Sequence, residues 1–242
     1  MDTKVISYPK CGRTWLRMLI GQYLILKHSL PQELILESEK LTQLSRLSKL
    51  SFTHEDSDWN ENKKSIPYYE LSNNKATHKS NNIIFLHRGL EDTLVSSYFQ
   101  ATKRDIGFNG TISEFVRDDR FGAKKILQFN QIWIKNRTTP NKFMLLSYEE
   151  IHDNTNQALI DVLSFMGASI DSKLVEQAVE KCSFTNMKRA EEKNTYNSFR
   201  LQPGDIKDQE SFKIRKGTVG GYTDYLSAND ITYINQIKEE MK

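Results

Sequence analysis

Residues 7–18, "SYPKCGRTWLRM", indicate the fold because they join two elements of different type within a few residues. A short β-branched run at residues 4–8 leads into this cluster, and apolar residues at helical spacing continue from it to about residue 27. The pattern predicts a strand, a tight loop and a helix. The same order recurs after the apolar runs that start at residues 83 and 142, which favours a mostly parallel sheet flanked by helices.

The composition excludes several classes of function. The 34 basic and 31 acidic residues are interspersed, so a net charge of +3 provides no basic arm for nucleic acid. Two cysteines allow neither a disulfide framework nor a zinc-like cluster. No apolar run approaches the roughly 20 residues that cross a membrane, and the first ten residues lack a signal-peptide pattern. We therefore expect a soluble, cytoplasmic protein with no metal and no nucleic-acid or membrane partner.

The rest of the chain contains further helical stretches and one long polar segment. Helical patterns begin near Asp92 and cover residues 111–137, 155–166 and 171–181. With 242 residues and no repeat or linker, the chain is predicted to form a single domain over residues 1–242. Residues 194–222 are rich in turn residues and too long for a simple connection, which is typical of a functional loop.

The predicted loop after the first strand has the chemistry of an anion site. A Gly-containing turn that opens a helix points backbone N–H groups and the positive end of the helix dipole at one spot, where phosphate or sulfate binds. Lys10 and Arg13 add charge, and the Thr14 hydroxyl lies at the helix start. The nucleotide-binding pattern G-x-x-x-x-G-K-[ST] is absent, which disfavours a metal-bound triphosphate. A plain tight turn with solvated Lys10 and Arg13 remains the alternative.

Three motifs resemble those of the sulfotransferases that use 3′-phosphoadenosine 5′-phosphosulfate (PAPS). The stretch "SYPKCGRTWLRML" is similar to the 5′-phosphosulfate loop "YPKSGTTWL" of that family, with Cys11 and Arg13 in place of the common Ser and Thr. The stretch "HRGLEDTLVSSYF" resembles the 3′-phosphate motif and places Arg88 and Ser96 at its two binding positions. The stretch "RKGTVGGY" at residues 215–222 resembles the segment that closes over the same phosphate.

Two weaker similarities extend the resemblance over nearly the whole chain. They are "CSFTNM" at residues 182–187 and "LSYEEI" at residues 146–151. The resemblance implies a three-layer α/β fold like that of the P-loop nucleotide hydrolases, with PAPS as donor, 3′-phosphoadenosine 5′-phosphate (PAP) as product and no metal. The cofactor-binding residues that it implies are Lys10, Cys11, Gly12, Arg13, Thr14, Trp15, Arg88, Ser96, Tyr148, Ser183, Phe184, Arg215, Lys216 and Gly217.

The resemblance also assigns catalytic roles to two residues. Sulfuryl transfer needs a cation on the bridging oxygen of the departing nucleotide and a base for the attacking group. Lys10 suits the first role. His54 in "SFTHED" matches the family's catalytic histidine, and an imidazole with a pKa near 6.5 accepts a proton at neutral pH. Glu55 and Asp56 are alternative bases.

The acceptor is predicted less directly. Acids and aromatics gather as weak candidates for a cationic small molecule, namely Glu55, Asp56, Trp59, Tyr98 and Phe99. A solvated loop with a few core aromatics is the alternative. The high Asn, Lys and Ile content favours a bacterial source, and we expect sulfation of a hydroxyl or amine on a small natural product, such as a guanidinium alkaloid of the saxitoxin type.

Other functions and one unusual residue stay open at this stage. The alternatives are a P-loop small-molecule kinase and a non-catalytic nucleotide-binding protein. The family's dimer motif has no good match in "GGYTDYLSANDITYI", so no oligomeric state is predicted. Arg13 either strengthens the binding of phosphosulfate or extends toward the acceptor.

Overall fold

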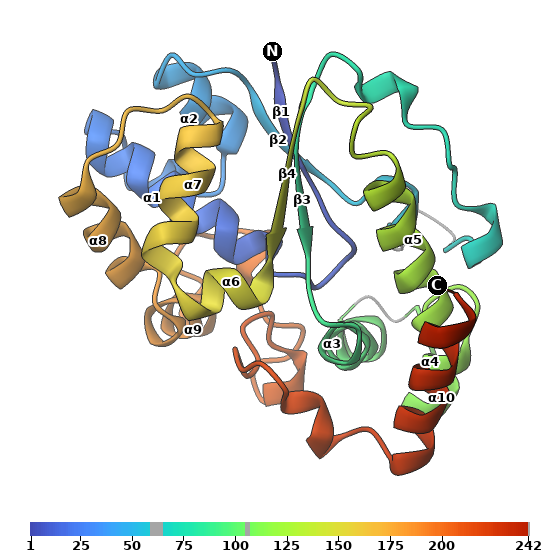
Figure 1. Ribbon diagram of the computed structural model, residues 1–242. Helices are drawn as coiled ribbons and strands as arrows, with labels where there is room; N and C mark the ends of the chain where they lie inside the picture. The colour runs from blue at the N-terminus through green and yellow to red at the C-terminus, as the bar shows by residue number, and fades with distance from the viewer. Residues whose placement is uncertain (59–64, 105–106, 242) are drawn as a thin grey trace.

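The computed structural model describes residues 1–58, 65–104 and 107–241 and contains a four-stranded parallel sheet in the order β2-β1-β3-β4. Its strands are β1 (Thr3–Ile6), β2 (Leu50–Thr53), β3 (Asn82–His87) and β4 (Lys142–Ser147). Because all four run the same way, their carboxyl ends meet at one edge, at the bottom of Figure 1. The predicted parallel α/β fold is confirmed.

Helices cover both faces of the sheet (Figure 1). One layer contains α1 (Arg13–His28), α2 (Ser38–Leu44), α6 (Tyr148–Asp153), α7 (Thr155–Phe165) and α8 (Ser172–Lys181). The other contains α3 (Leu90–Lys103), α4 (Ile112–Arg117), α5 (Ala123–Lys135) and α10 (Ala228–Glu240). Below the carboxyl edge lies α9 (Phe184–Glu192).

Short 3₁₀ turns occupy the connections. They are η1 (Gln32–Leu34), η2 (Glu55–Ser57), η3 (Tyr68–Glu70), η4 (Ala76–His78), η5 (Phe199–Leu201), η6 (Gln209–Ser211) and η7 (Gly221–Asp224). The long polar segment after α9 therefore folds as a loop with three such turns. Among the helices of the described residues, none combines the length and apolar character needed to cross a bilayer.

The core lies on both faces of the sheet because the central strands are apolar throughout. In β3, the four residues from Ile83 to Leu86 are at most 1% exposed. Trp133 and Phe129 of α5 pack against Phe85 from one face. Because the central strands are buried on both faces, their carboxyl ends are fixed in position, which gives the loops that follow them a rigid base.

One predicted helical stretch, residues 111–137, is two helices instead of one. Thr111 and Glu114 form a capping box that starts α4, which ends at Arg117. Two aspartates and Gly122 follow, and all three are weak helix formers, so the chain turns before α5 begins. The predicted helices at residues 155–166 and 171–181 are confirmed to within one residue at each end.

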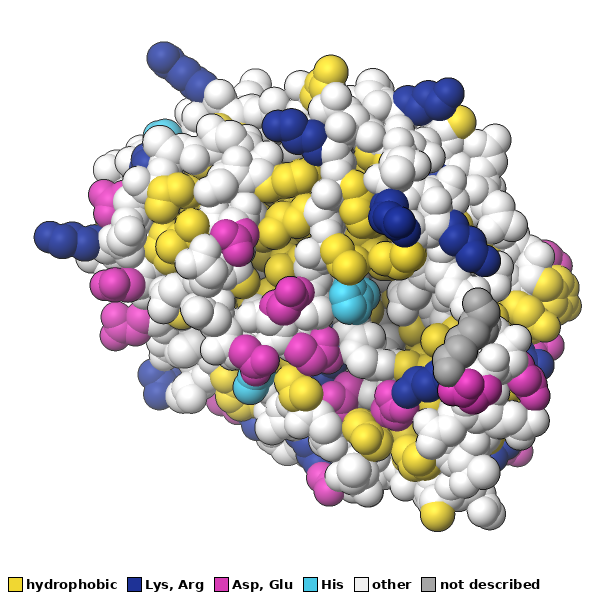
Figure 2. All heavy atoms as spheres, in the orientation of Figure 1, with side chains coloured by type: hydrophobic (Ala, Val, Ile, Leu, Met, Phe, Trp, Pro, Cys, Tyr) yellow, Lys and Arg dark blue, Asp and Glu magenta, His cyan; other side chains and the backbone are white. Residues whose placement is uncertain are grey.

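The strand β4 lies at the edge of the sheet. In the space-filling view, hydrophobic side chains gather over the middle of this face, over β4 (Figure 2). Leu145 is 48% exposed, whereas Leu146, the next residue, is buried. The alternation follows from the pleat of an edge strand that is covered on one side.

A buried carboxylate fastens the long C-terminal loop to the rest of the fold. Glu191 of α9 is 0% exposed and accepts hydrogen bonds from the backbone N–H groups of Lys213 (2.6 Å) and Ile214 (2.7 Å). The guanidinium of Arg104 lies 3.8 Å from the same carboxylate. The helix α9 thus fixes the start of the loop that carries the "RKG" motif.

We predict that Glu191→Ala lowers the free energy of unfolding by about 3–5 kcal/mol, because two N–H groups and a guanidinium lose their buried partner. Thermal or urea unfolding measures the change. Glu192→Ala removes the neighbouring exposed carboxylate and should stay within about 0.5 kcal/mol of the parent. Equal losses in the two variants would show that Glu191 does not anchor the loop.

Candidate active site

A cavity of about 680 Å³ opens at the carboxyl edge of the sheet. Its walls come from the β1–α1 loop, α3, the starts of α6 and α9 and the loop after residue 212. The structure brings these predicted residues together around it: Lys10, Gly12, Arg13, Thr14, Trp15, His54, Arg88, Ser96, Tyr148, Ser183, Phe184, Arg215, Lys216 and Gly217.

The β1–α1 loop has the backbone geometry of an anion site. Lys10 and Gly12 both have left-handed backbones, with φ of 71° and 92°. A side chain at Gly12 would place its Cβ 2.7 Å from the Tyr148 ring, so glycine is required there. Among the described residues, no side chain is found capping the first turn of α1, which begins at Arg13. The unpaired N–H groups of this turn are therefore left for an anion.

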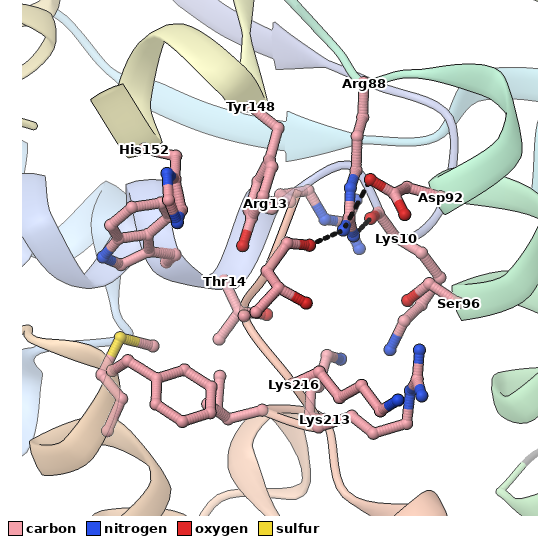
Figure 3. A pocket seen from close by; sticks show the side chains of 18 of the residues that line it. Lys10, Arg13, Thr14, Arg88, Asp92, Ser96, Tyr148, His152, Lys213 and Lys216 are labelled. Carbon is pink, nitrogen blue, oxygen red and sulfur yellow. Dashed lines mark hydrogen bonds and ion pairs between the residues drawn. The ribbon is translucent and has the colours of Figure 1, made fainter. Parts of the chain in front are cut away.

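One face of α3 runs along the cavity. Asp92, Ser96 and Gln100 follow one another at four-residue spacing and all line the wall. The ammonium of Lys10 donates a hydrogen bond to the side-chain oxygen of Gln100 (3.1 Å). In Figure 3 the Lys10 side chain lies beside Ser96. The helix thus positions the lysine that follows β1.

Arg88 lies at the end of β3 with part of its hydrogen-bonding capacity unused. Its guanidinium stacks on the Tyr148 ring (4.2 Å) and donates to the carbonyl oxygen of Thr218 (3.1 Å). Its Nε is buried and has no partner among the described residues. Asp92 lies 3.8 Å from the same guanidinium. A planar fork with an unpaired buried N–H fits a phosphate oxygen.

Asp92 also holds the "RKG" loop against the cavity. Its carboxylate accepts hydrogen bonds from the backbone N–H groups of Gly220 (2.7 Å) and Tyr222 (3.1 Å). Gly217 has φ of 65°, and a Cβ there would lie 2.3 Å from the Phe184 ring. The loop therefore packs backbone against ring, a contact that glycine alone allows.

The two basic residues of this loop are paired with acids in the structure. Arg215 donates to the carboxylate of Glu210 (3.0 Å) and to the hydroxyl of Tyr225 (2.8 Å). Lys216 donates to the carboxylate of Asp224 (2.8 Å). Both residues line the same cavity as Arg88 and Ser96, so a bound phosphate would compete with these acids for them.

Aromatic side chains line the cavity beside the anion loop. Trp15 donates from its indole N–H to the carbonyl oxygen of Cys182 (3.1 Å), which fixes the ring. The rings of Trp15 and Tyr148 are 5.7 Å apart, and Phe184 is 39% exposed. Flat apolar surfaces next to phosphate-binding groups suit a nucleobase.

His54 follows β2 and has a defined tautomer. Its Nδ1 lies 2.8 Å from the carbonyl oxygen of Ser7, which can only accept, so Nδ1 carries the proton and Nε2 keeps its lone pair. Burial, and then the charge of Arg13, hold the pKa of His54 well below 6.5. The imidazole is therefore neutral near pH 7 and can accept a proton at Nε2.

Three predicted residues lie outside the cavity because they contact other groups. Cys11 is 1% exposed, and burial raises the pKa of its thiol to about 12. Glu55 pairs with His78 (3.3 Å), and Asp56 with Lys75 (3.7 Å). Cys11 thus contributes no side chain to the wall, and neither acid replaces His54 as a base there.

Two aromatic acceptor candidates, Tyr98 and Phe99, are also absent from the cavity wall. The hydroxyl of Tyr98 donates to the carbonyl oxygen of Gly110 (3.1 Å), and Phe99 packs against Tyr225. Trp59 lies outside the described residues. The predicted wall of acids and aromatics for a cationic acceptor does not form among the described residues.

Several lining residues are missing from the sequence predictions. They include Asp92, Gln100, Arg104, His152, Lys213 and Thr218. The four-residue spacing from Ser96 would have pointed to Asp92 and Gln100, whereas the others depend on contacts between distant segments. Among the described residues, no group of three or more His, Cys, Asp or Glu side chains could hold a metal ion.

We predict that Asp92→Ala speeds amide hydrogen exchange in residues 215–222 by roughly 10- to 100-fold, because two charge-assisted hydrogen bonds to the loop are lost. Exchange followed by mass spectrometry measures the rate. Asp153→Ala, which removes an exposed carboxylate, should leave these residues unchanged. Equal protection in Asp92→Ala and the parent would contradict the anchoring role.

Comparison with known proteins places the chain in a family. The sulfotransferase domain model matches residues 1–242. The chain is 25% identical to the amine sulfotransferase of Oryctolagus cuniculus over 259 aligned positions, which cover 100% of this chain and 81% of that one. It is 24% identical to cytosolic sulfotransferase 12 of Arabidopsis thaliana, with coverage of 99% and 76%.

Solved structures show the same fold. Mouse sulfotransferase SULT7A1 complexed with PAP superposes with a TM-score of 0.65 at 18% identity, covering 99% of this chain and 84% of that one. Retinol dehydratase in complex with androsterone and PAP superposes with a TM-score of 0.66 at 15% identity, covering 99% and 80%. The chain belongs to the sulfotransferase domain family.

Proposed function

We propose that this protein transfers a sulfuryl group from PAPS to a hydroxyl or amine of a small molecule. The observation that carries the proposal is the single cavity that joins an uncapped helix start, Arg88, an aromatic wall and a neutral His54. Family membership supports it, as do the names of an amine sulfotransferase and of PAP-bound structures among the similar proteins. Cytosolic relatives and only two cysteines, both reduced, support a cytoplasmic location.

The residues of the cavity fit a nucleotide with two anionic ends. Arg88, with its unpaired buried Nε, and Ser96 would hold the 3′-phosphate. The uncapped start of α1, with Gly12 and the Thr14 hydroxyl, would hold the 5′-phosphate end. The adenine would then lie against the aromatic rings, and Arg215 and Lys216 would exchange their acidic partners for phosphate oxygens. These assignments match the roles that the sequence resemblance implies.

PAPS supplies the sulfuryl group, whose bond to the 5′-phosphate oxygen breaks as a bond to the acceptor oxygen or nitrogen forms. Lys10, held by Gln100, places its ammonium where it can neutralise the charge left on that phosphate oxygen. Nε2 of His54 accepts the proton that the acceptor releases, while Nδ1 remains bonded to Ser7. The partly buried position of His54 favours its neutral form, which is the form that this step needs.

The alternatives are less well supported. A P-loop kinase needs a longer glycine loop and carboxylates for magnesium, whereas the described cavity wall holds seven Lys or Arg residues and three acids. A non-catalytic nucleotide-binding protein would have no use for a neutral, oriented His54. The predicted guanidinium acceptor depended on a wall of acids and aromatics, and Glu55, Asp56, Tyr98 and Phe99 contact other groups.

We predict that His54→Ala slows sulfuryl transfer about 10²- to 10⁴-fold and Lys10→Ala about 10²- to 10³-fold, because each removes a group that acts in the transition state. Transfer of label from [³⁵S]PAPS to a phenol, measured in single turnover, checks both. His28→Ala, an exposed histidine at the far end of α1, is the matched control. Parent-like rates in the His54 and Lys10 variants would refute the assigned roles.

The pH profile gives a second readout of the same prediction. Protonation of His54 removes the base, and its pKa is lowered, so kcat/KM should hold through pH 6.5 and fall only at lower pH. His54→Ala should lose this acid limb. If kcat/KM of that variant still fell at low pH as in the parent, or if the fall in the parent began above pH 6.5, the base would be another group.

A further inference from the structure

The end of the cavity that receives the acceptor can be located along α3. Asp92 lies beside Arg88, and two turns on, Gln100 holds Lys10. One further four-residue step, a rise of about 6 Å, reaches Arg104, which also lines the cavity. His54 and Arg13 line the wall as well. Arg104 therefore marks the end of α3 farther from Arg88, and the acceptor end is the part of the wall that holds the proposed base, His54, with Arg13 as its strongest charged neighbour.

Basic side chains surround the proposed base at this end. The charged groups that act most strongly on His54 are Arg13, Lys213 and Arg17, and all three lower its pKa. Arg13 and Lys213 line the cavity itself, from α1 and from the loop before the "RKG" motif. Arg104 is committed to the fold, because it pairs with Glu191 (3.8 Å) and donates to the carbonyl oxygen of Ser211 (2.9 Å).

The guanidinium groups of Arg17 and Arg200 act electrostatically on that of Arg13. Burial lowers the pKa of Arg13 to about 10; among the neighbouring charges Asp58 opposes this shift most strongly, and Arg200 adds to it. Arg17, one turn further along α1, has its pKa lowered to about 9 by burial, Arg13 and Arg200. The side chain of Arg13 makes no hydrogen bond or ion pair with any described residue. Partly buried like charges that repel one another are relieved by a bound anion.

We propose that the acceptor is an organic acid whose anionic group binds Arg13 and Lys213 beside the hydroxyl or amine that faces His54. The inference rests on the proposed sulfuryl transfer and names its substrate class. A planar guanidinium binds a carboxylate, sulfate or phosphate through two parallel hydrogen bonds, and a lysine adds a point charge. The same charges repel a cationic acceptor, which disfavours a guanidinium alkaloid.

An anionic acceptor also explains why Arg13 differs from the residue usual in the 5′-phosphosulfate loop of the sulfotransferases. Arg13 occupies a position where that loop usually carries a threonine, in "CGRTW". The side chain acts on His54, Arg17 and Arg200. Its charge is therefore directed toward the acceptor end. A bound anion next to it would raise the pKa of His54 toward its ordinary value and so strengthen the base where the reaction needs it.

The test uses three phenols that differ only in the charge of the side arm: 4-hydroxyphenylacetate, 4-hydroxyphenylacetamide and tyramine. Calorimetry measures their binding to the PAP-loaded protein, and [³⁵S]PAPS measures their sulfation. We expect the acid to bind at least tenfold more tightly than the amide, and tyramine to bind most weakly. In Arg13→Thr and in Lys213→Met the preference for the acid should fall below threefold, with PAP affinity changed less than threefold.

Arg137→Thr removes an exposed cation near the amino edge of the sheet and is the matched control, which should keep the parent preference. Equal binding of the three phenols, tightest binding of tyramine or no binding of any of them overturns the proposal. Loss of PAP affinity in Arg13→Thr overturns it too, because Arg13 would then serve the donor. Sulfation of the phenols without a charge preference would leave the proposed function standing, whereas failure of the parent to bind PAP would refute that function itself.

Discussion

The structure depends on four parallel strands that end at one edge of the sheet. That edge places the groups that follow directly after the strands: Lys10 and His54 follow β1 and β2, Arg88 follows β3, and Tyr148 starts the helix after β4. Because the central strands β1 and β3 are largely buried on both faces, the loops that leave them have a fixed base. Oriented N–H groups and a neutral imidazole can then face the same volume without any rearrangement.

Two carboxylates hold the remaining wall. Glu191 fixes the start of the C-terminal loop at Lys213 and Ile214, and Asp92 fixes its end at Gly220 and Tyr222. Between these points lies the "RKG" segment, whose arginine and lysine are paired with Glu210 and Asp224. The loop is thus anchored at both ends, while its charged middle keeps acidic partners that a phosphate can replace.

The sequence predicted the parts of the site that depend on local order. The strand, loop and helix around Gly12, and the eight-residue step from Arg88 to Ser96, are local patterns. Contacts between distant segments could not be predicted from local order. Examples are the placement of Lys213 in the same cavity wall as His54, and the pairing of Glu55 with His78 that removes this acid from the wall. The cationic character of the acceptor end comes from such contacts, which is why we propose an anionic acceptor in place of the expected cationic one.

The central claim is that the cavity binds a nucleotide with separate 3′- and 5′-anionic ends and no metal. Isothermal titration of the protein with PAP, adenosine 5′-phosphate and magnesium-ATP tests it most directly. PAP should bind roughly 100-fold more tightly than adenosine 5′-phosphate, because only PAP places a phosphate at Arg88 and Ser96. Equal affinity for these two ligands, or tighter binding of magnesium-ATP than of PAP, would contradict the claim.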